Sequence, residues 1–186
     1  MHRGYTNNNN KMTNSKLTVI LDLDNTLIFS KYAKSSTTLS DFLITINENG
    51  HYVDIAVNKR PKLDYFLSTL SKIATLFLFT AASRDYAEEI LSQIDPFNIY
   101  FEKVFTREDC KLTSEGIYKK DYSKCITNFS RTIIIDDIPT NFIDYKDNGL
   151  PIAPFKGQTM DNELNRIIQI ISVLNTVPDV RLLKRV

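Results

Sequence analysis

Val-Ile-Leu-Asp-Leu-Asp-Asn-Thr-Leu-Ile, residues 19–28, is the stretch that decides the fold of this chain. The apolar run 19–21 contains β-branched residues and is too short for a helix, so it predicts a buried strand. Because side chains alternate along a strand, Asp22 and Asp24 can face the same way while Leu23 points into the core. Ligands of open parallel sheets bind beyond the carboxyl ends of the strands, so we expect this acidic pair at the mouth of a site.

The composition is that of an ordinary globular protein. With 186 residues, of which 42% are hydrophobic, the chain has enough apolar material for the core of one domain. It carries 23 basic and 22 acidic residues, so nothing in its net charge of +1 indicates nucleic acid or an anionic membrane as a partner. Cys110 and Cys125 lack metal-ligand or redox spacing, and we expect both to be reduced thiols.

The two ends of the chain are predicted to lie outside the folded domain. Residues 1–16 are rich in Asn and lack the apolar stretch of a signal peptide, so they are predicted to be a disordered tail. The domain is predicted to span residues 17–175, and residues 176–186 to form a C-terminal tail. The longest apolar run, residues 73–82, is shorter than the roughly 20 residues that cross a bilayer. We therefore expect an intracellular protein, cytoplasmic or nuclear.

A small β insertion is predicted directly after the first strand. Residues 30–40 are rich in Ser and Thr and are interpreted as a loop. Apolar and polar residues then alternate on both sides of Asn49-Gly50, a pair typical of tight hairpins because both residues tolerate positive φ. The insertion is therefore predicted to occupy about residues 41–58.

The rest of the chain alternates between strand and helix patterns. Buried strands are predicted at residues 74–79, 104–105 and 131–135, and helices after Pro61, after Ser83 and from Asp161 onward. Residues 139–154 are interpreted as loop. This order predicts an α/β fold, a Rossmann-like core whose mainly parallel sheet is flanked by helices.

Acidic residues close two of the predicted strands, and this pattern suits phosphoryl transfer. That reaction needs a nucleophile, a proton donor for the leaving oxygen and positive charge around the transferred group. Asp22 is the candidate nucleophile that forms an aspartyl-phosphate. Asp24 is the candidate acid, and later the base that activates water, because crowded carboxylates raise one another's pKa.

The remaining candidates surround this pair. Mg²⁺ binds a few carboxylates together with a phosphate oxygen, so Asp22 and Asp137, with Asp136 less directly, are candidate ligands. Thr80 and Lys120 are candidates for holding the phosphate, although a Thr at a strand end can simply favour strand and a Lys can be solvated. A calcium loop beginning at Asp22 is excluded, because its required Gly and closing Glu are replaced by the residues Leu27 and Ala33.

Four segments of the chain together resemble the motifs of the haloacid dehalogenase superfamily. They are, in order, Asp22-Leu23-Asp24-Asn25-Thr26, Phe79-Thr80-Ala81-Ala82-Ser83, Lys120-Asp121, and Ile135-Asp136-Asp137-Ile138-Pro139. Further matches place the chain near the carboxy-terminal-domain phosphatase branch, which includes the small phosphatases of the RNA polymerase II C-terminal domain. These matches are Arg60-Pro61, Tyr86-Ala87, residues 118–121 and residues 161–164.

The resemblance implies a magnesium-dependent phosphatase of phosphoserine or phosphothreonine in proteins, possible substrates including the C-terminal domain of RNA polymerase II. It implies that Asp22 is nucleophile and metal ligand, and that Asp24 is acid and base and reaches the metal through its backbone carbonyl. Thr80 and Lys120 are implied to hold phosphate and Asp137 to bind metal. Two further residues, Thr26 and Asp136, are implied to support them.

Two other functions remain open at this point. A phosphatase of the same superfamily that acts on a small metabolite is one, although such enzymes usually carry a larger cap than this insertion. A binding module of the same fold without catalysis, related to the mitochondrial import subunit, is the other. The intact acidic pair, Thr80, Lys120 and Asp137 argue against the second alternative.

Overall fold

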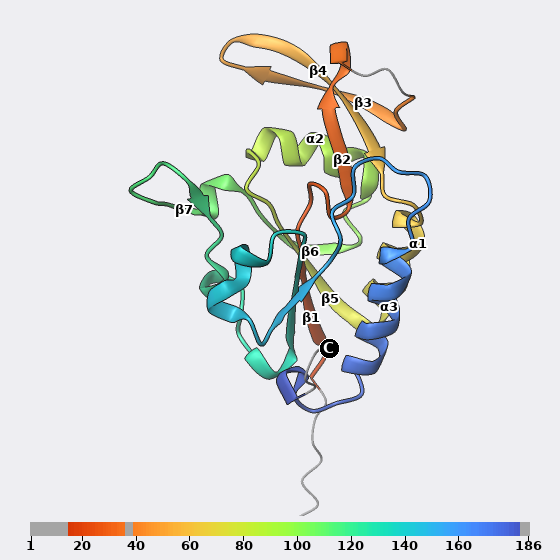
Figure 1. The fold of residues 1–186 in the computed structure, drawn as a ribbon, viewed down its shortest axis with the longest axis vertical. Coiled ribbons are helices and arrows are strands. Elements are labelled where there is room, and N and C mark those ends of the chain that lie inside the picture. Colours follow the sequence, from red (N-terminus) through yellow and green to blue (C-terminus); the bar gives the residue numbers. More distant parts are fainter. Residues whose placement is uncertain (1–14, 36–38, 183–186) are drawn as a thin grey trace, which may run out of the picture.

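The computed structural model describes residues 15–35 and 39–182 and has a five-stranded parallel sheet at its centre (Figure 1). The strand order is β10-β9-β1-β5-β6, and each neighbouring pair is parallel. The strands are β1 (Leu17–Leu21), β5 (Ala74–Phe79), β6 (Phe101–Phe105), β9 (Thr132–Asp136) and β10 (Gly149–Pro151). The predicted α/β class with a mainly parallel sheet is confirmed.

Three α-helices accompany this sheet: α1 (Leu63–Ile73), α2 (Arg84–Ile94) and α3 (Glu163–Leu174). Helices α1 and α3 contact each other and lie side by side along the sheet, as Figure 1 shows. Helix α3 begins two residues later than predicted, because Asp161 is engaged in an ion pair before the helix starts. Ser83 occupies the position before α2, but its side chain makes no capping hydrogen bond.

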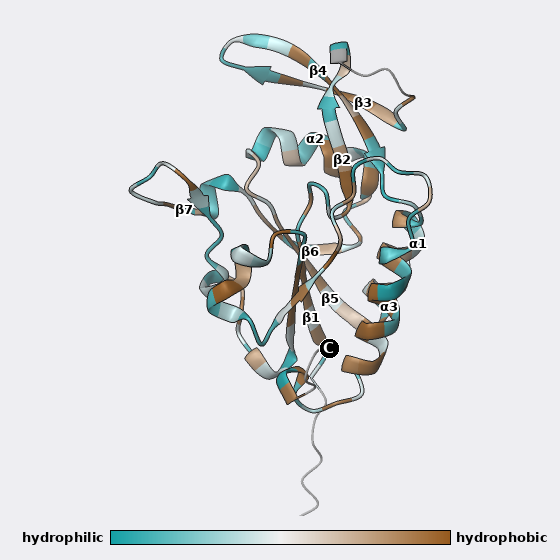
Figure 2. Ribbon diagram, in the orientation of Figure 1, coloured by the Kyte–Doolittle hydropathy of each residue, from teal (hydrophilic) through white to brown (hydrophobic). Residues whose placement is uncertain are grey.

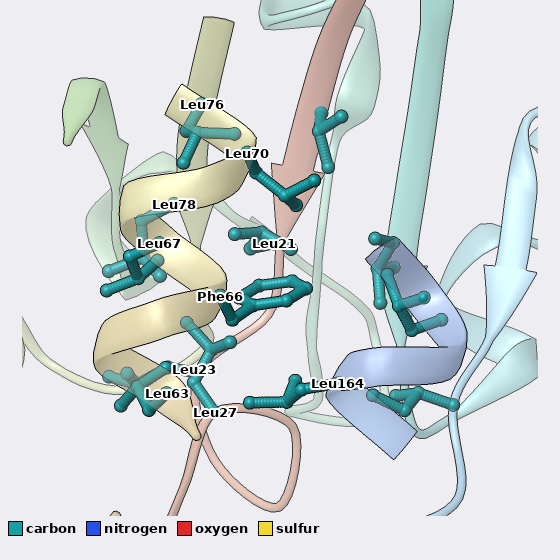
Figure 3. Close-up of a cluster of buried hydrophobic side chains, with 14 of the residues drawn as sticks. Leu21, Leu23, Leu27, Leu63, Phe66, Leu67, Leu70, Leu76, Leu78 and Leu164 are labelled. Carbon is teal, nitrogen blue, oxygen red and sulfur yellow. The ribbon is translucent and has the colours of Figure 1, made fainter. Parts of the chain in front are cut away.

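The alternation of side chains along β1 divides the core into two clusters. Val19 and Leu21 belong to the larger cluster beneath α1 and α3, whereas Ile20 points into a smaller cluster on the other side. Figure 3 shows Phe66 and Leu70 of α1 directed toward Leu21, opposite Leu164 of α3. Figure 2 shows hydrophobic residues concentrated along the central strands, as expected for a sheet covered on both faces.

The insertion is a three-stranded antiparallel sheet rather than a hairpin alone. It consists of β2 (Ile28–Tyr32), β3 (Phe42–Glu48) and β4 (His51–Lys59) in the order β2-β4-β3. The interpretation of residues 30–40 as loop was therefore wrong for the part that lies in β2. Ile28–Tyr32 pairs with Ile55–Lys59, and this distant partner stabilises a strand that the polar local sequence does not indicate. Residues 36–38 of that segment lie outside the described residues.

One face of the insertion packs against the core. Ile44, Ile55 and Val57 are buried in the larger cluster, and Phe42 and Ile46 pack against it. The alternation predicted for β3 is confirmed, since Leu43 and Thr45 are exposed.

The interpretation of residues 139–154 as loop was wrong for its centre, which contains a 3₁₀-helical segment at Pro139–Tyr145 and the edge strand β10. Only three residues long, β10 shows no periodic pattern. At Gly149 an added Cβ would lie 2.0 Å from the Phe142 ring, so glycine is required by close packing.

Two short strands, β7 (Lys111–Leu112) and β8 (Tyr118–Lys119), form a separate antiparallel hairpin. Residues 1–14 of the predicted N-terminal tail and residues 183–186 of the C-terminal tail lie outside the described residues. Within the described part of the latter, Val180 is buried in the larger cluster.

Candidate active site

Asp22 lies at the carboxyl end of β1, next to the adjacent strand β9. Its backbone N–H donates to the Ile135 carbonyl at 2.9 Å, which extends the pairing of the two strands by one residue. The chain then turns at Asn25, whose φ of 58° is a conformation that Asn tolerates well. Leu23 and Leu27 are fully buried and fix both ends of this turn.

Lys120 bridges two of the carboxylates. Its Nζ donates to Asp22 Oδ1 at 2.5 Å and to Asp136 Oδ2 at 2.7 Å. The Lys120 side chain is only 2% exposed, so it is not the solvated surface lysine that the sequence left open. Residues 98 positions apart in the sequence are thus joined at one edge of the sheet.

Burial and charge act against each other in this group. Burial raises the pKa of Asp22 to about 7, although Lys120 opposes the shift. Burial alone would lower the pKa of Lys120, but Asp22, Tyr122 and Asp136 together raise it. Lys120 therefore remains a fixed positive charge at neutral pH.

Asp136 is anchored on both of its oxygens. Besides Lys120, the amide of Asn141 donates to Oδ1 at 2.9 Å and to Oδ2 at 3.0 Å, and the Ile138 N–H donates to Oδ1 at 2.8 Å. Asp136 therefore has little capacity left for other ligands and serves to orient Lys120.

Asp22, Asp136 and Asp137 can each place one oxygen within 4.8 Å of the others'. Asp22 Oδ2 is buried and has no hydrogen-bond partner among the described residues, which is costly unless another group binds it. Asp137 is half-buried, and burial together with Asp136 raises its pKa. A hard divalent cation with oxygen ligands fits this set, with Asp22 and Asp137 as the free carboxylates.

Thr80 follows β5, the other neighbour of β1 in the sheet, so it lies at the same carboxyl edge as Asp22. Its backbone N–H donates to the Phe105 carbonyl at 3.0 Å. Its hydroxyl accepts from the Ala82 N–H at 3.0 Å, which leaves the hydroxyl proton to be donated elsewhere. Thr26 is fully buried, and its hydroxyl also lacks a partner among the residues described.

The Asp24 carboxylate contacts two hydroxyl groups. Tyr86 Oη donates to Asp24 Oδ1 at 2.6 Å and lies 2.8 Å from Ser30 Oγ. Burial raises the pKa of Asp24, while the Tyr86 hydrogen bond lowers it in part. Burial also raises the pKa of Tyr86, so its phenol remains protonated. The Tyr86 and Ser30 contacts were missed from the sequence, which placed Tyr86 on a helix face and Ser30 in a loop.

A cleft of about 520 Å³ opens beside Asp24, between the insertion and the start of α2. Ile46 and Glu48 line it from β3, and Asp85, Tyr86 and Arg107 line it from the other side. This cleft gives a substrate larger than a phosphate ion room beside the acidic pair.

A buried ion pair between Arg60 and Asp161 stabilises the turn that follows β1. Arg60 donates to both oxygens of Asp161, at 2.9 and 2.8 Å, and also to the Thr26 carbonyl at 3.0 Å and the Ala153 carbonyl at 2.7 Å. Its guanidinium lies over the Phe155 ring. Arg60 thus links the turn after β1 to the segment that precedes α3.

A family model described as NLI interacting factor-like phosphatase matches residues 17–181. The chain belongs to this family. Membership confirms the resemblance to the carboxy-terminal-domain phosphatase branch of the haloacid dehalogenase superfamily. Among the described residues, none of the helices is both long and apolar enough to cross a membrane.

Individual proteins of known name resemble the chain over most of its length. It is 36% identical over 174 residues to nuclear envelope morphology protein 1 of Schizosaccharomyces pombe, covering 91% of the chain and 36% of that protein. It is 30% identical over 165 residues to human carboxy-terminal domain RNA polymerase II polypeptide A small phosphatase 1, covering 89% and 62%. The chain therefore spans less than two thirds of either relative.

Solved structures show the same fold. The chain matches the fission yeast RNA polymerase II CTD phosphatase Fcp1, in a variant bound to beryllium fluoride, with a TM-score of 0.65 and 20% identity. That match covers 87% of this chain and 51% of the other. A second Fcp1 structure gives a TM-score of 0.66 with 19% identity.

Proposed function

We propose that this protein is a magnesium-dependent serine/threonine phosphatase that acts through an aspartyl-phosphate on Asp22. The observation that carries the proposal is the position of Lys120 between Asp22 and Asp136 at the end of β1. A buried lysine held by two carboxylates is expensive to maintain for stability alone, because each ion loses its hydration. It is well suited to a site where a phosphate dianion must approach acidic residues.

The side chains divide the reaction among themselves. Asp22 attacks phosphorus through one carboxylate oxygen, and the bond between phosphorus and the seryl oxygen breaks. Asp24 gives its proton to that leaving oxygen and then takes a proton from the water that hydrolyses the aspartyl-phosphate. Lys120 and the Thr80 hydroxyl hold the equatorial oxygens of the phosphate.

Asp22 and Asp137 are the side chains that would hold Mg²⁺, with the Asp24 backbone carbonyl as a further ligand. When bound, the cation neutralises the charge that accumulates between the carboxylates and the phosphate. Magnesium suits the set better than zinc, because the donors are all oxygens.

We further propose that the substrate is phosphoserine or phosphothreonine in a protein, and that the protein acts inside the cell. The names of the relatives suggest two kinds of substrate. The human relative is named for the C-terminal domain of RNA polymerase II, so its phosphorylated repeat is the first candidate. The fission yeast relative is named for nuclear envelope morphology, so another phosphoprotein is the second.

The test is a side-by-side assay of three kinds of substrate, with Mg²⁺ and then with EDTA. They are phosphorylated peptides from the polymerase tail, unrelated phosphoserine peptides, and sugar and nucleotide phosphates. We expect release of phosphate from peptides that depends on Mg²⁺ and is abolished in Asp22→Asn. Asp64→Asn, on an exposed carboxylate of α1, is the matched control and should retain activity. Preference for metabolites would refute the substrate assignment, and activity unaffected by Asp22→Asn would refute the enzymatic one.

A further inference from the structure

Three polar side chains from separate elements meet beside the cleft. Tyr86 of α2 and Ser30 of β2 have their hydroxyl oxygens 2.8 Å apart, and Asp24 Oδ1 lies 2.6 Å from the tyrosine oxygen and 3.5 Å from the serine oxygen. No hydrogen bond from the described residues reaches the other oxygen of Asp24, Oδ2. Within the described part of the chain, the carboxyl group of Asp24 is thus held through Oδ1 alone.

Counting protons gives this chain of contacts a direction. A phenol has one proton and is neutral at physiological pH, so Tyr86 can donate to one acceptor. An ionised Asp24 can only accept, so it takes that proton, and the Ser30 hydroxyl then donates to the Tyr86 oxygen. Oδ1 is occupied in this arrangement, and Oδ2 is the oxygen that exchanges a proton with substrate.

The geometry points to Tyr86 and Ser30 as positioning residues for Asp24, which fix Oδ1 so that Oδ2 presents its proton to the leaving alcohol. The inference rests on the proposed function, because it assigns a partner to the acid of that reaction. General acid catalysis requires the donor within hydrogen-bond distance of the leaving oxygen, and a carboxyl free to rotate meets this condition less often.

The two hydroxyl groups are themselves held rigidly. Tyr86 is 9% exposed and belongs to the larger core cluster. Ser30 is paired with Val57 in the sheet of the insertion. Asp24 is therefore positioned jointly by the parallel core, through α2, and by the insertion, through β2.

Leaving groups of different basicity separate positioning from a merely structural role. 4-Nitrophenolate is a weak base and departs without a proton. Phenolate is more basic, so its departure depends more on a proton donor. A serine alkoxide is the most basic of the three and depends on the proton donor most. Comparison of kcat/KM is the appropriate readout, because it includes no step after the leaving group departs. Hydrolysis of the aspartyl-phosphate also uses Asp24, but it follows that departure and therefore does not affect kcat/KM.

In Tyr86→Phe we expect kcat/KM to fall about tenfold or more for a phosphoserine peptide, a part of the roughly 10²–10⁴ that general acids contribute. The loss should be smaller for phenyl phosphate and within about twofold for 4-nitrophenyl phosphate. Ser30→Ala should rank the three substrates in the same way, with the largest loss on the phosphoserine peptide, but each loss should be smaller than in Tyr86→Phe. Tyr65→Phe, at a 59% exposed tyrosine of α1, is the matched control and should change none of them.

A double-mutant cycle provides the second measurement. In an Asp24→Asn background, Tyr86→Phe should cause no further loss on the phosphopeptide, since there is no acid left to position. Equal losses on all three substrates, or a further loss in that background, would overturn the inference alone. No magnesium-dependent hydrolysis by the unsubstituted protein would overturn the proposed function and this inference with it. If Tyr86→Phe does not fold, Ser30→Ala decides the inference. A loss that is largest on the phosphoserine peptide and smallest on 4-nitrophenyl phosphate supports it, and equal losses on the three substrates overturn it.

Discussion

Arg60 and Asp161 form a buried bidentate ion pair, although 101 positions separate them in the sequence. The Arg60 side chain has no exposed surface and that of Asp161 is 5% exposed. Because Arg60 also binds the Thr26 carbonyl, the pair connects the segment before α3 with the turn that carries the acidic residues.

Asp161→Asn leaves the Arg60 guanidinium buried without its charge partner. We expect the free energy of unfolding to fall by about 3 kcal/mol, measured by urea denaturation, because breaking a buried pair costs roughly 3–5 kcal/mol. Asp64→Asn removes an exposed carboxylate paired with Lys59 and should cost at most about 1 kcal/mol. Equal effects of the two substitutions would show that the buried pair contributes no more than a surface one.

The same pair predicts a pH dependence of stability. Burial would raise the pKa of Asp161, but the hydrogen bonds from Arg60 and from the Glu163 N–H outweigh it, and the pKa is lowered. A carboxylate with a depressed folded-state pKa stabilises the protein above its unfolded value of about 3.9, and this contribution is lost as pH falls toward the folded value. The stability difference between the unsubstituted protein and Asp161→Asn should therefore shrink from about pH 5 to pH 3. A constant difference over this range would contradict the assignment.

Gly149→Ala tests the packing of the edge strand β10. The added Cβ would overlap the Phe142 ring, and we expect a loss of about 1–3 kcal/mol in unfolding free energy. Phe142→Leu removes part of the obstructing ring, so the double variant should be more stable than the sum of the two single losses predicts. Strict additivity would mean that the two residues do not compete for space.

Lys120→Met replaces the bridging charge with an apolar chain of similar length. We expect kcat/KM on a phosphoserine peptide to fall by about a hundredfold or more, the size of effect seen when one preorganised donor to transition-state charge is removed. Lys119→Met is the adjacent matched control, because Lys119 is exposed and pairs with Asp144. Comparable losses in the two variants would contradict the role proposed for Lys120.

The sequence indicates those parts of the fold that are written in continuous apolar runs. Strand β5 has the bounds that its six apolar or β-branched residues predict, and β1 and β9 agree within two residues. Strands β2 and β10 were missed because their stability comes from distant partners, residues 55–59 and 134–136 respectively.

The residues of the candidate site likewise fall into those that the local sequence indicates and those that depend on distant contacts. Asp22, Thr80 and Asp137 could be chosen from their positions at strand ends, and Lys120 from its motif. The Tyr86 and Ser30 contacts with Asp24 could not, because they depend on how α2 and β2 are placed in space relative to Asp24. The same holds for Asn141, whose two hydrogen bonds to Asp136 follow from the 3₁₀ turn after β9.

Trapping the covalent phosphate on Asp22 is the most direct test of the account. The protein is mixed with Mg²⁺ and a phosphoserine peptide, quenched during turnover and reduced with borohydride, which converts an aspartyl-phosphate to homoserine. Mass spectrometry should find homoserine at position 22 and at no other aspartate position. A control reaction without the peptide should contain no homoserine. Turnover of the peptide with position 22 unmodified, or with the label at another residue, would contradict the proposed mechanism.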